Sequence, residues 1–520
     1  MAVEMNPSSY VKTVFLSAIM ILMTQVGYAE NMDFSIGLDQ ETESSDTGGS
    51  TPALTPSVEG AELLVGQAMT NITFQYNPSP TSDFTSSSSF AYANNKVSAG
   101  TQHTCAILGN GSLMCWGGDT YGQVGDGGSN SPSASSTPVS VDLGTGRTAL
   151  AVSAGHEHTC AILDNGNLSC WGRDSYGALG NGMPLGSLGS PASVDLGTGR
   201  TAVAVSAGYL HTCAILDNGD LKCWGSDNNG QLGDGGTISS NAYTSAPSST
   251  AIDLGTGRTA VAVSAGREHT CAILDNGDLK CWGDDSKGQL GDGGANTDTS
   301  APSSTAIDLG TGRTAVAVDA GSTHTCAILD NGEAKCWGSD SSGQLGDGGT
   351  THNTYTYTAA PSSTAIDLGT GRTAVALSAG LKSTCAILDN GEAKCWGDYA
   401  RGLLGLGQFA GQTDAYAPPS TAIDFGTGRT AVAISTGWEH ACALLNDGNL
   451  SCWGNDNNGR LGNGGGNVDK WAPDLIGSGT WDSSSTGATC SISPALPTGL
   501  SMDSSTCTIS GTPSVATSNT

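Results

Sequence analysis

The sequence predicts an all-β fold in which similar four-stranded units form a ring. One segment recurs seven times, because the first Cys of each copy follows the previous one by 53 to 59 residues. Each copy holds four short apolar runs, typified by AIDL, AVAVSA, TCAIL and LKCW, and no sustained helical period follows the first 30 residues. Gly accounts for 76 of 520 residues, about twice its usual share, which is typical of strands joined by tight turns. Seven such units in a closed radial array form a β-propeller.

Closure of this ring is the part of the fold that the repeats leave open. Only six GTGR segments separate the seven copies. The seventh blade therefore takes its fourth strand either from near Phe90 or from near Leu475. We expect the first and last blades to share strands.

The central hairpin of each repeat can be built from its turn. In the fourth copy, DNG forms a three-residue turn with Gly277 in the left-handed position. Counting outward, Ile273 faces Leu279 and Cys271 faces Cys281 as non-hydrogen-bonded pairs, whose Cα atoms lie about 4.5 Å apart. That separation suits a disulfide, which we expect to contribute about 2–3 kcal/mol. The alternation of strand side chains also places Ile273 and Leu279 on the Cys face, toward the neighbouring blade.

The cysteines as a set indicate an oxidising compartment. Sixteen Cys form an even number, and fourteen fall into seven pairs. The predicted disulfides are Cys105–Cys115, Cys160–Cys170, Cys213–Cys223, Cys271–Cys281, Cys326–Cys336, Cys385–Cys395 and Cys442–Cys452.

The N-terminus predicts export. Lys12 precedes a ten-residue apolar run, and Gly27 and Ala29 occupy the small-residue positions before a cut at Glu30. The run suits a signal peptide at 1–29 and is too short to span a bilayer. We expect no transmembrane span after its removal.

The net charge of −29 excludes some partners. Proteins that neutralise phosphates need clustered Lys and Arg, and this chain has only 19 such residues and no basic run. Nucleic acid and anionic membranes are therefore not expected as partners.

A His precedes the first Cys by two residues in six of the seven copies, and Ser383 replaces it in the sixth. We interpret these histidines as structural, bonded within the blade, with a His-Cys-Cys zinc site as the alternative. The set is His103, His158, His211, His269, His324 and His440.

Acidic, Gly-rich loops such as Gly225–Gly236 follow each hairpin. They read as turns, with weak calcium binding as the alternative, although the alternate-position spacing of linear calcium loops is missing. The calcium candidates are Asp227, Asp234, Asp292 and Asp347. Calcium is the one cofactor considered, and no other is expected.

No catalytic constellation is found. GTGRTA matches a dinucleotide-binding pattern, but a strand and not a helix follows it, so we interpret it as a turn. The sequence lacks a GxSxG elbow, an HExxH motif and a P-loop. We therefore name no catalytic residue.

The loops before each AIDL run are the candidates for recognition, because insertions in repeat proteins map to one face. Their aromatic residues suit contacts with proteins or glycans. The candidates are Tyr243, Tyr355, Tyr357, Tyr416 and Trp471. The alternative is a solvated loop with incidental Tyr.

The repeat resembles that of the regulator of chromosome condensation family. The residues that carry the resemblance are the AG step, the His before the first Cys, the turn Gly, the Trp-Gly pair and the later Gly-x-x-Gly, as in Gly288–Gly291. The resemblance covers roughly residues 90–477 and implies a seven-bladed propeller. Nucleotide exchange on a nuclear GTPase, known in that family, is disfavoured here because the chain looks exported and has no basic tail.

The flanks of the repeats resemble a second family. Residues 490–513 read CSISPALPTGLSMDSSTCTISGTP, which is similar to immunoglobulin-like (cadherin-like) modules of cell-surface proteins, and residues 61–76 resemble the start of the same module. In that comparison Cys507 replaces a Gly and has Cys490 as its partner. We hypothesise one sandwich, at 58–89 and 478–520, into which the propeller at 90–477 is inserted, preceded by a disordered acidic linker at 30–57. The module's last strands are missing, so we expect a longer parent protein.

These observations together predict an exported or cell-surface propeller that binds protein or glycan without catalysis. The alternatives are a secreted enzyme acting on polysaccharide, a GTPase regulator and a passive structural repeat of the envelope.

Overall fold

The computed structural model describes the propeller in residues 96–128, 134–183, 186–294, 296–349, 356–407 and 413–476, together with the backbone of five short strands outside it. The chain divides into two units, 84–486 and the two flanks combined. The signal peptide, Tyr355 and the pair Cys490 and Cys507 lie outside the described residues.

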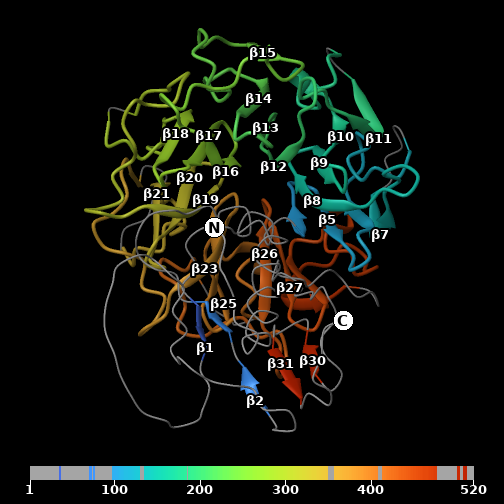
Figure 1. Cartoon of the computed structure of the whole chain (residues 1–520), viewed down its shortest axis with the longest axis vertical. Helices are drawn as coiled ribbons and strands as arrows, with labels where there is room; N and C mark the ends of the chain where they lie inside the picture. The colour runs from blue at the N-terminus through green and yellow to red at the C-terminus, as the bar shows by residue number, and fades with distance from the viewer. Residues whose placement is uncertain are drawn as a thin grey trace, which may run out of the picture. The chain divides into compact units, whose positions relative to one another are not determined.

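The larger unit is the predicted seven-bladed propeller, seen down the ring in Figure 1. In each blade four successive chain segments run antiparallel, and the first of them lies nearest the centre of the ring. These inner strands are β4 Val97–Ala99, β8 Ala149–Ala154, β12 Ala202–Ala207, β16 Ala260–Ala265, β19 Ala315–Ala320, β23 Ala374–Ala379 and β26 Ala431–Thr436.

The next two strands of each blade form the predicted hairpin. They are β5 His103–Ile107 and β6 Leu113–Gly117, β9 His158–Leu163 and β10 Leu168–Arg173, β13 His211–Leu216 and β14 Leu221–Ser226, β17 His269–Leu274 and β18 Leu279–Gly283, β20 His324–Leu329 and β21 Ala334–Ser339, β24 Ser383–Leu388 and β25 Ala393–Gly397, and β27 His440–Leu445 and β28 Leu450–Gly454.

The register of these hairpins is the one that the turn predicts. Cys271 faces Cys281 and Ile273 faces Leu279, and Gly277 adopts a φ of 80°, as the turn requires. All seven predicted pairs within the propeller form disulfides, each with a Cα–Cα distance of 4.1 Å. Their cysteines are at most 6% exposed. The seven disulfides indicate an oxidising environment for this protein.

The outermost position of the blades differs from the prediction. It is filled by β7 Ser135–Ser140, β11 Ser187–Ser193, β15 Tyr243–Thr244, β22 Tyr357–Thr358 and β29 Lys470–Leu475, and by single bridges at Thr299 and Ala415 in blades 4 and 6. The prediction that AIDL is a strand was wrong, since in blade 3 it is irregular and keeps one backbone bond, from Ile252 N–H to Leu221 O. Leu254 still packs into the core, so the apolar pattern marks burial and not strand pairing.

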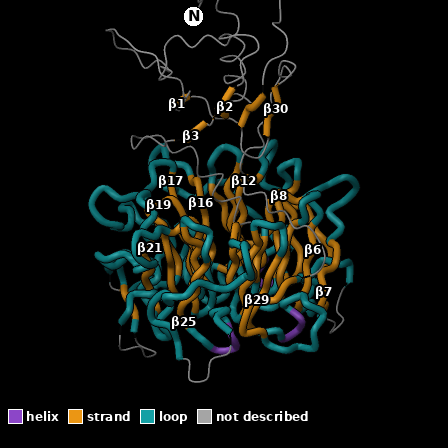
Figure 2. The backbone as a smooth tube through the Cα atoms, turned by 90° about the horizontal axis from the view of Figure 1, so that it is seen from below, coloured by secondary structure: helices purple, strands orange, loops and turns teal. Residues whose placement is uncertain are grey.

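The core lies between the blades and not within them. Seven clusters of buried side chains each join one blade to the next. In one cluster Ile273 and Leu279 of blade 4 pack against Trp337 of blade 5, as the face alternation predicts. Figure 2 shows the strands running side by side between two loop-bearing ends of the ring.

Each blade is one continuous stretch of chain, so the expected strand sharing was wrong. Blade 1 runs from β4 to β7 and blade 7 from β26 to β29, which is the alternative near Leu475. Side chains close the ring in place of a shared strand. Ala99 N–H of blade 1 donates to Ser435 Oγ of blade 7, and His440 Nε2 lies 2.7 Å from Thr104 Oγ1.

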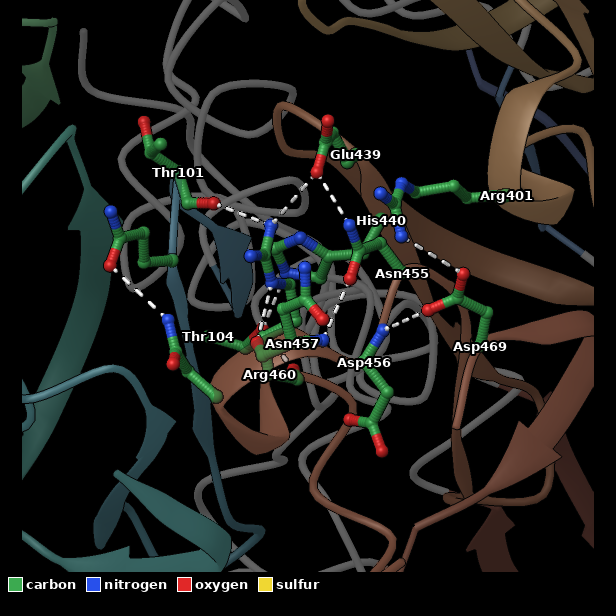
Figure 3. Close-up of polar contacts among 12 residues, drawn as sticks. Thr101, Thr104, Arg401, Glu439, His440, Asn455, Asp456, Asn457, Arg460 and Asp469 are labelled. Carbon is green, nitrogen blue, oxygen red and sulfur yellow. Dashed lines mark hydrogen bonds and ion pairs between the residues drawn. The ribbon is translucent and has the colours of Figure 1, made fainter. Parts of the chain in front are cut away.

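Arg460 is the main residue at this seam (Figure 3). It occupies the position that is Gln in the GQLG segments of other blades, and it is only 5% exposed. Its guanidinium donates to Thr101 O at 3.0 Å and to Asn457 O at 2.9 Å. Its own carbonyl accepts from Thr104 Oγ1 and from Trp116 Nε1, each at 2.9 Å. Arg460 therefore links blade 7 to three points of blade 1.

The remaining interfaces repeat two of these contacts. The predicted structural histidines are fully buried, but each bonds to a Thr of the next blade and not within its own blade, at 2.7–3.0 Å. Burial lowers the pKa of His103 to about 3 and that of His269 to about 4, so both are neutral at pH 7. The zinc alternative is not met, because the neighbouring cysteines are bonded to each other.

The interface between blades 6 and 7 departs from this pattern at three positions. Ser383 replaces the His and Ala441 replaces its Thr partner. Thr436 replaces the Ala of the AG step, and its Cγ2 occupies the space beside Gly380 where a His ring lies in the other blades. Ser383 Oγ and Thr436 Oγ1 are buried without a hydrogen-bond partner.

Restoring the repeat at this interface should stabilise the propeller. We expect the triple variant S383H/T436A/A441T to gain about 1–2 kcal/mol, because it forms one buried hydrogen bond and removes two unpaired hydroxyls. S383H alone should destabilise, since its ring meets Thr436 and finds no acceptor at Ala441. Urea unfolding of the triple variant and of each single variant measures this. A triple variant no more stable than wild type would contradict the role of the His–Thr bond.

A second belt of hydrogen bonds joins the inner strands. In each blade a side-chain oxygen of the inner strand accepts the N–H of the last residue of the next blade's inner strand, at 2.8–2.9 Å. We call it the serine belt, and its members are Ser98, Ser153, Ser206, Ser264, Asp319, Ser378 and Ser435. Asp319 is its one carboxylate, bonded to Ala379 N–H and to Ser264 Oγ.

Asp319 should make stability depend on pH. Its enclosure between inner strands raises its pKa to about 6. Since the unfolded chain loses this proton near pH 4, the contribution of Asp319 to stability falls as pH rises from about 4 to 6 and then stays low. We expect D319S, which restores the belt residue, to be more stable than wild type by about 1–3 kcal/mol at pH 7 and equal to it near pH 3.5.

Thermal or urea unfolding across pH 3.5–7.5 measures this difference. D319N is the matched control, because it removes the charge and keeps the shape. Its stability relative to wild type should therefore change with pH as that of D319S does. Parallel curves for wild type and D319S would contradict the prediction.

The smaller unit is described only as backbone strands. β1 Phe34–Ile36 lies in the expected linker and pairs with β3 Phe74–Tyr76. β2 Met69–Ile72, which precedes the propeller in the chain, pairs with β31 Thr508–Gly511, which follows it, and β31 pairs with β30 Leu500–Asp503. Strands from both flanks thus share one sheet, and the insertion of the propeller into one sandwich stays a prediction.

Candidate binding site at the axis of the ring

A pocket of about 80 Å³ lies on the axis of the ring, where the inner strands end. We call it the axial pocket. The last strand residue and the following Gly of every blade line it, from Ala99–Gly100 in blade 1 to Thr436–Gly437 in blade 7. All seven blades therefore contribute to one site.

The AG step explains why the blades can converge there. A β-carbon on Gly266 would lie 2.6 Å from Gly321 O of the next blade, closer than real contacts allow. With Gly at this position, the N–H after the step reaches the next blade, as from Arg267 N–H to Gly321 O at 3.3 Å. In blades 1 to 5 this bond holds the residue after the Gly at the rim of the axial pocket.

The rim residues vary although the segment around them repeats. Large side chains come from four blades, and three of them are aromatic. They are His156 in blade 2, Tyr209 in blade 3, Arg267 in blade 4 and Trp438 in blade 7. The rings of Tyr209 and Trp438 lie within 5° of parallel at 5.4 Å between centroids.

His156 and Arg267 complete this cluster. The His156 ring stacks on Tyr209 at 4.0 Å and on Trp438 at 5.4 Å. The Arg267 guanidinium lies 5.4 Å from the Tyr209 centroid, which allows a cation–π contact. Burial lowers the pKa of His156, so its ring is neutral at pH 7. We call these four residues the rim cluster.

The carboxylates beside the rim cluster are paired with arginines. Glu157 binds Arg173, Glu268 Oε1 lies 4.0 Å from Arg267 Nε, and Glu439 Oε2 lies 3.8 Å from Arg460. Arg173 also lies over the Tyr121 ring at 4.5 Å. The rim thus carries aromatic and hydrogen-bonding groups with balanced charge.

The predicted recognition residues lie elsewhere and come from four different blades. Tyr243 and Tyr357 are exposed on the short outer strands β15 and β22. Tyr416 packs over Gly343, the backbone of Trp471 lies against Gly402, and the Trp471 ring lies 5.2 Å from the Tyr399 ring. Tyr416 and Trp471 therefore contact the Gly-x-x-Gly loop of the preceding blade and help to hold the ring together.

The calcium candidates are each engaged in local turns. Asp227 Oδ1 accepts Leu232 N–H, and burial raises the pKa of Asp227 to about 6. Asp234, Asp292 and Asp347 each accept the N–H two residues later. Within the described ranges, no three His, Cys, Asp or Glu side chains gather as a metal site would require. Calcium binding stays a prediction.

Sequence reasoning missed the rim cluster, although a signal for it exists. The two residues between the AG step and the His are the most varied part of an otherwise repeated segment: TQ, HE, YL, RE, ST, LK and WE. Since strand direction alternates, these turns and the loops that carry the predicted aromatics lie at the same end of the ring. The predicted face is therefore the one that holds the axial pocket.

Comparison with known families shows to which family the chain belongs. A model described as an RCC1-like domain matches residues 186–493, more than half of the chain. The chain belongs to the RCC1-like domain family. Models of the RCC1 repeat match this RCC1-like chain at 95–123, 110–162 and 150–178, and a model for Ig domains matches residues 472–520.

Relatives of this RCC1-like chain have diverse descriptions. It is 29% identical over 382 residues to the ultraviolet-B receptor UVR8 of Arabidopsis thaliana, covering 73% of this chain and 81% of UVR8. It is 28% identical over 256 residues to the E3 ubiquitin-protein ligase HERC2 of Homo sapiens, covering 49% of this chain and only 5% of HERC2.

Solved structures share the fold. Prp20p of Saccharomyces cerevisiae, studied for its binding to Gsp1p and histones, superposes with a TM-score of 0.61 at 18% identity, over 75% of this chain and 89% of Prp20p. Human WBSCR16 gives a TM-score of 0.59 at 20% identity, over 71% of this chain and 95% of WBSCR16. In the described part of the RCC1-like chain, no helix has the length and apolar character that crossing a membrane requires.

Proposed function

We propose that this RCC1-like propeller is an exported or cell-surface scaffold that binds a protein or a glycan at the axial pocket and catalyses no reaction. One observation carries the proposal: the rim cluster gathers three aromatic side chains and an Arg from four blades onto one pocket. Aromatic and Arg side chains supply most of the energy at binding surfaces. Export is supported by the buried disulfides and by the predicted signal peptide.

The ring favours binding because it fixes the rim residues in advance. The serine belt joins the inner strands, and the seven disulfides and the His–Thr bonds hold the second and third strands behind them, so little conformational freedom remains to be lost when a ligand binds. The glutamates at the rim are already paired with arginines. This arrangement suits hydrogen bonding to a ligand better than it suits proton transfer.

The test is a binding measurement with the oxidised full chain. Envelope extracts and a glycan array are probed with wild type and with a rim variant, Y209A/W438A. Any captured partner is then purified and titrated. Saturable binding that the rim variant loses, and that the outer-strand control Y243A/Y357A keeps, supports the proposal.

Two results would overturn it. Binding that the rim variant retains in full would place recognition elsewhere. If no component of the extracts and no glycan binds saturably at high micromolar concentrations, the passive structural repeat is favoured.

A further inference from the structure

The rim of the axial pocket is uneven in a way that leaves room for a ligand. Blades 2, 3, 4 and 7 place large side chains there, whereas Thr101 of blade 1 and Ser322 of blade 5 are small and 6% exposed. A ligand that enters the pocket therefore meets the aromatic cluster on one side and short hydroxyl side chains on the other.

Trp438 is the surface that such a ligand would contact. It is half-buried and lines the pocket, and its ring is supported by Tyr209, parallel within 5°, and by His156, within 25°. The Tyr209 ring already has His156 at 4.0 Å and Arg267 at 5.4 Å. The supporting rings hold the indole in one orientation, so its face forms a fixed platform.

The charge balance of the rim selects for a neutral ligand. Each glutamate that follows a rim residue lies within 4.0 Å of an arginine or is bonded to one. A charged ligand would compete with these pairs, whereas a neutral ligand leaves them in place. A hydrogen-bond donor nevertheless remains for hydroxyls, because the Arg267 side chain is exposed.

The pocket is open toward the rim, so a ligand can use both at once. With a volume of about 80 Å³, it admits a substituent such as a hydroxymethyl or an N-acetyl group. The sugar ring then lies on the rim, against the rim cluster.

From these features we infer that the axial pocket and its rim cluster bind the terminal residue of a neutral saccharide. The C–H face of the sugar packs on the Trp438 indole, whose electron-rich face attracts it. One substituent enters the pocket, and the Arg267 guanidinium donates to the sugar hydroxyls. This inference rests on the proposed scaffold function and specifies its ligand.

The experiment is a fluorescence titration of the oxidised full chain with neutral oligosaccharides of the cello, chito, malto and manno series. Oligosaccharides of alginate and polygalacturonate serve as anionic counterparts. The seven blade tryptophans are fully buried, and Trp438 and Trp471 are the half-buried ones in the described residues. A ligand at the rim should therefore change the emission of Trp438.

We expect at least one neutral series to bind saturably, and W438A to weaken it by about tenfold or more. W438F should retain part of the affinity, because it keeps an aromatic face. W471F is the matched control and should keep both the affinity and the emission change. Melting temperatures of all variants verify that the ring is intact.

Each remaining outcome has a defined meaning. No saturable change with any neutral series, or equal affinity in W438A and wild type, overturns the saccharide inference. If a purified protein partner binds and requires Trp438 while all saccharides fail, the inference falls and the scaffold function stands. If no ligand of either class requires the rim, both fall.

Discussion

We expect complete reduction of the seven disulfides to prevent the propeller from folding. Each disulfide closes a loop between cysteines ten residues apart, and the loop-entropy estimate gives about 2.7 kcal/mol for one such loop. Seven such contributions exceed about 15 kcal/mol, the upper end of the usual stability of a domain.

The measurement must begin from unfolded protein, since the cysteines are at most 6% exposed and a reductant cannot reach them in the folded ring. The chain is reduced in denaturant, the denaturant is removed under reducing conditions, and circular dichroism and thermal melting follow refolding. The same sample reoxidised before refolding is the control. A reduced chain with the native spectrum and melting temperature would contradict the prediction.

We expect R460A to be the most damaging single substitution on the loops of the propeller, at about 2–4 kcal/mol. It removes charged hydrogen bonds to Thr101 O and Asn457 O, and it leaves the Thr101 carbonyl without that donor at the buried seam. Urea unfolding gives the loss directly.

Two variants separate the seam from general effects. R460Q introduces the residue of blades 1, 3, 4 and 5, where Gln Oε1 accepts an N–H two residues earlier, as Gln231 does from Asn229. It should recover the local turn but not the bond to Thr101, and so fall between wild type and R460A. R401A breaks the exposed pair with Asp469 and should cost less than about 1 kcal/mol. Equal losses of stability in R460A and R401A would contradict the special role of Arg460 at the seam.

What the sequence could predict is local. The register of Cys271 with Cys281 follows from a three-residue turn, so counting outward is enough. The burial of Leu254 also follows from apolar pattern, but its strand assignment does not. The outer edge of a blade has few packing neighbours. Which residues there pair as a strand therefore depends on the length of the preceding loop.

The seam and the rim cluster could not be predicted in this way. Arg460 bonds a carbonyl 359 residues earlier in the chain, and Trp438 stacks on Tyr209 across the ring. Both contacts depend on the number of blades and on the angle between them, which a single repeat does not encode. Variation within the repeat points to Trp438 as a site, and only the closed ring shows its neighbours.

The absence of a shared strand between the described parts of blades 1 and 7 has a consequence for how such a chain can change over generations. Every blade is encoded by one uninterrupted segment, so recombination between two GTGR-encoding stretches adds or deletes a whole sheet and leaves the others complete. In a ring closed by a shared strand, one blade would be complete only while the first and last segments of the chain are both present. The triplet Ser383, Thr436 and Ala441 shows the same independence on a finer scale, since one interface has changed its chemistry while six have kept theirs.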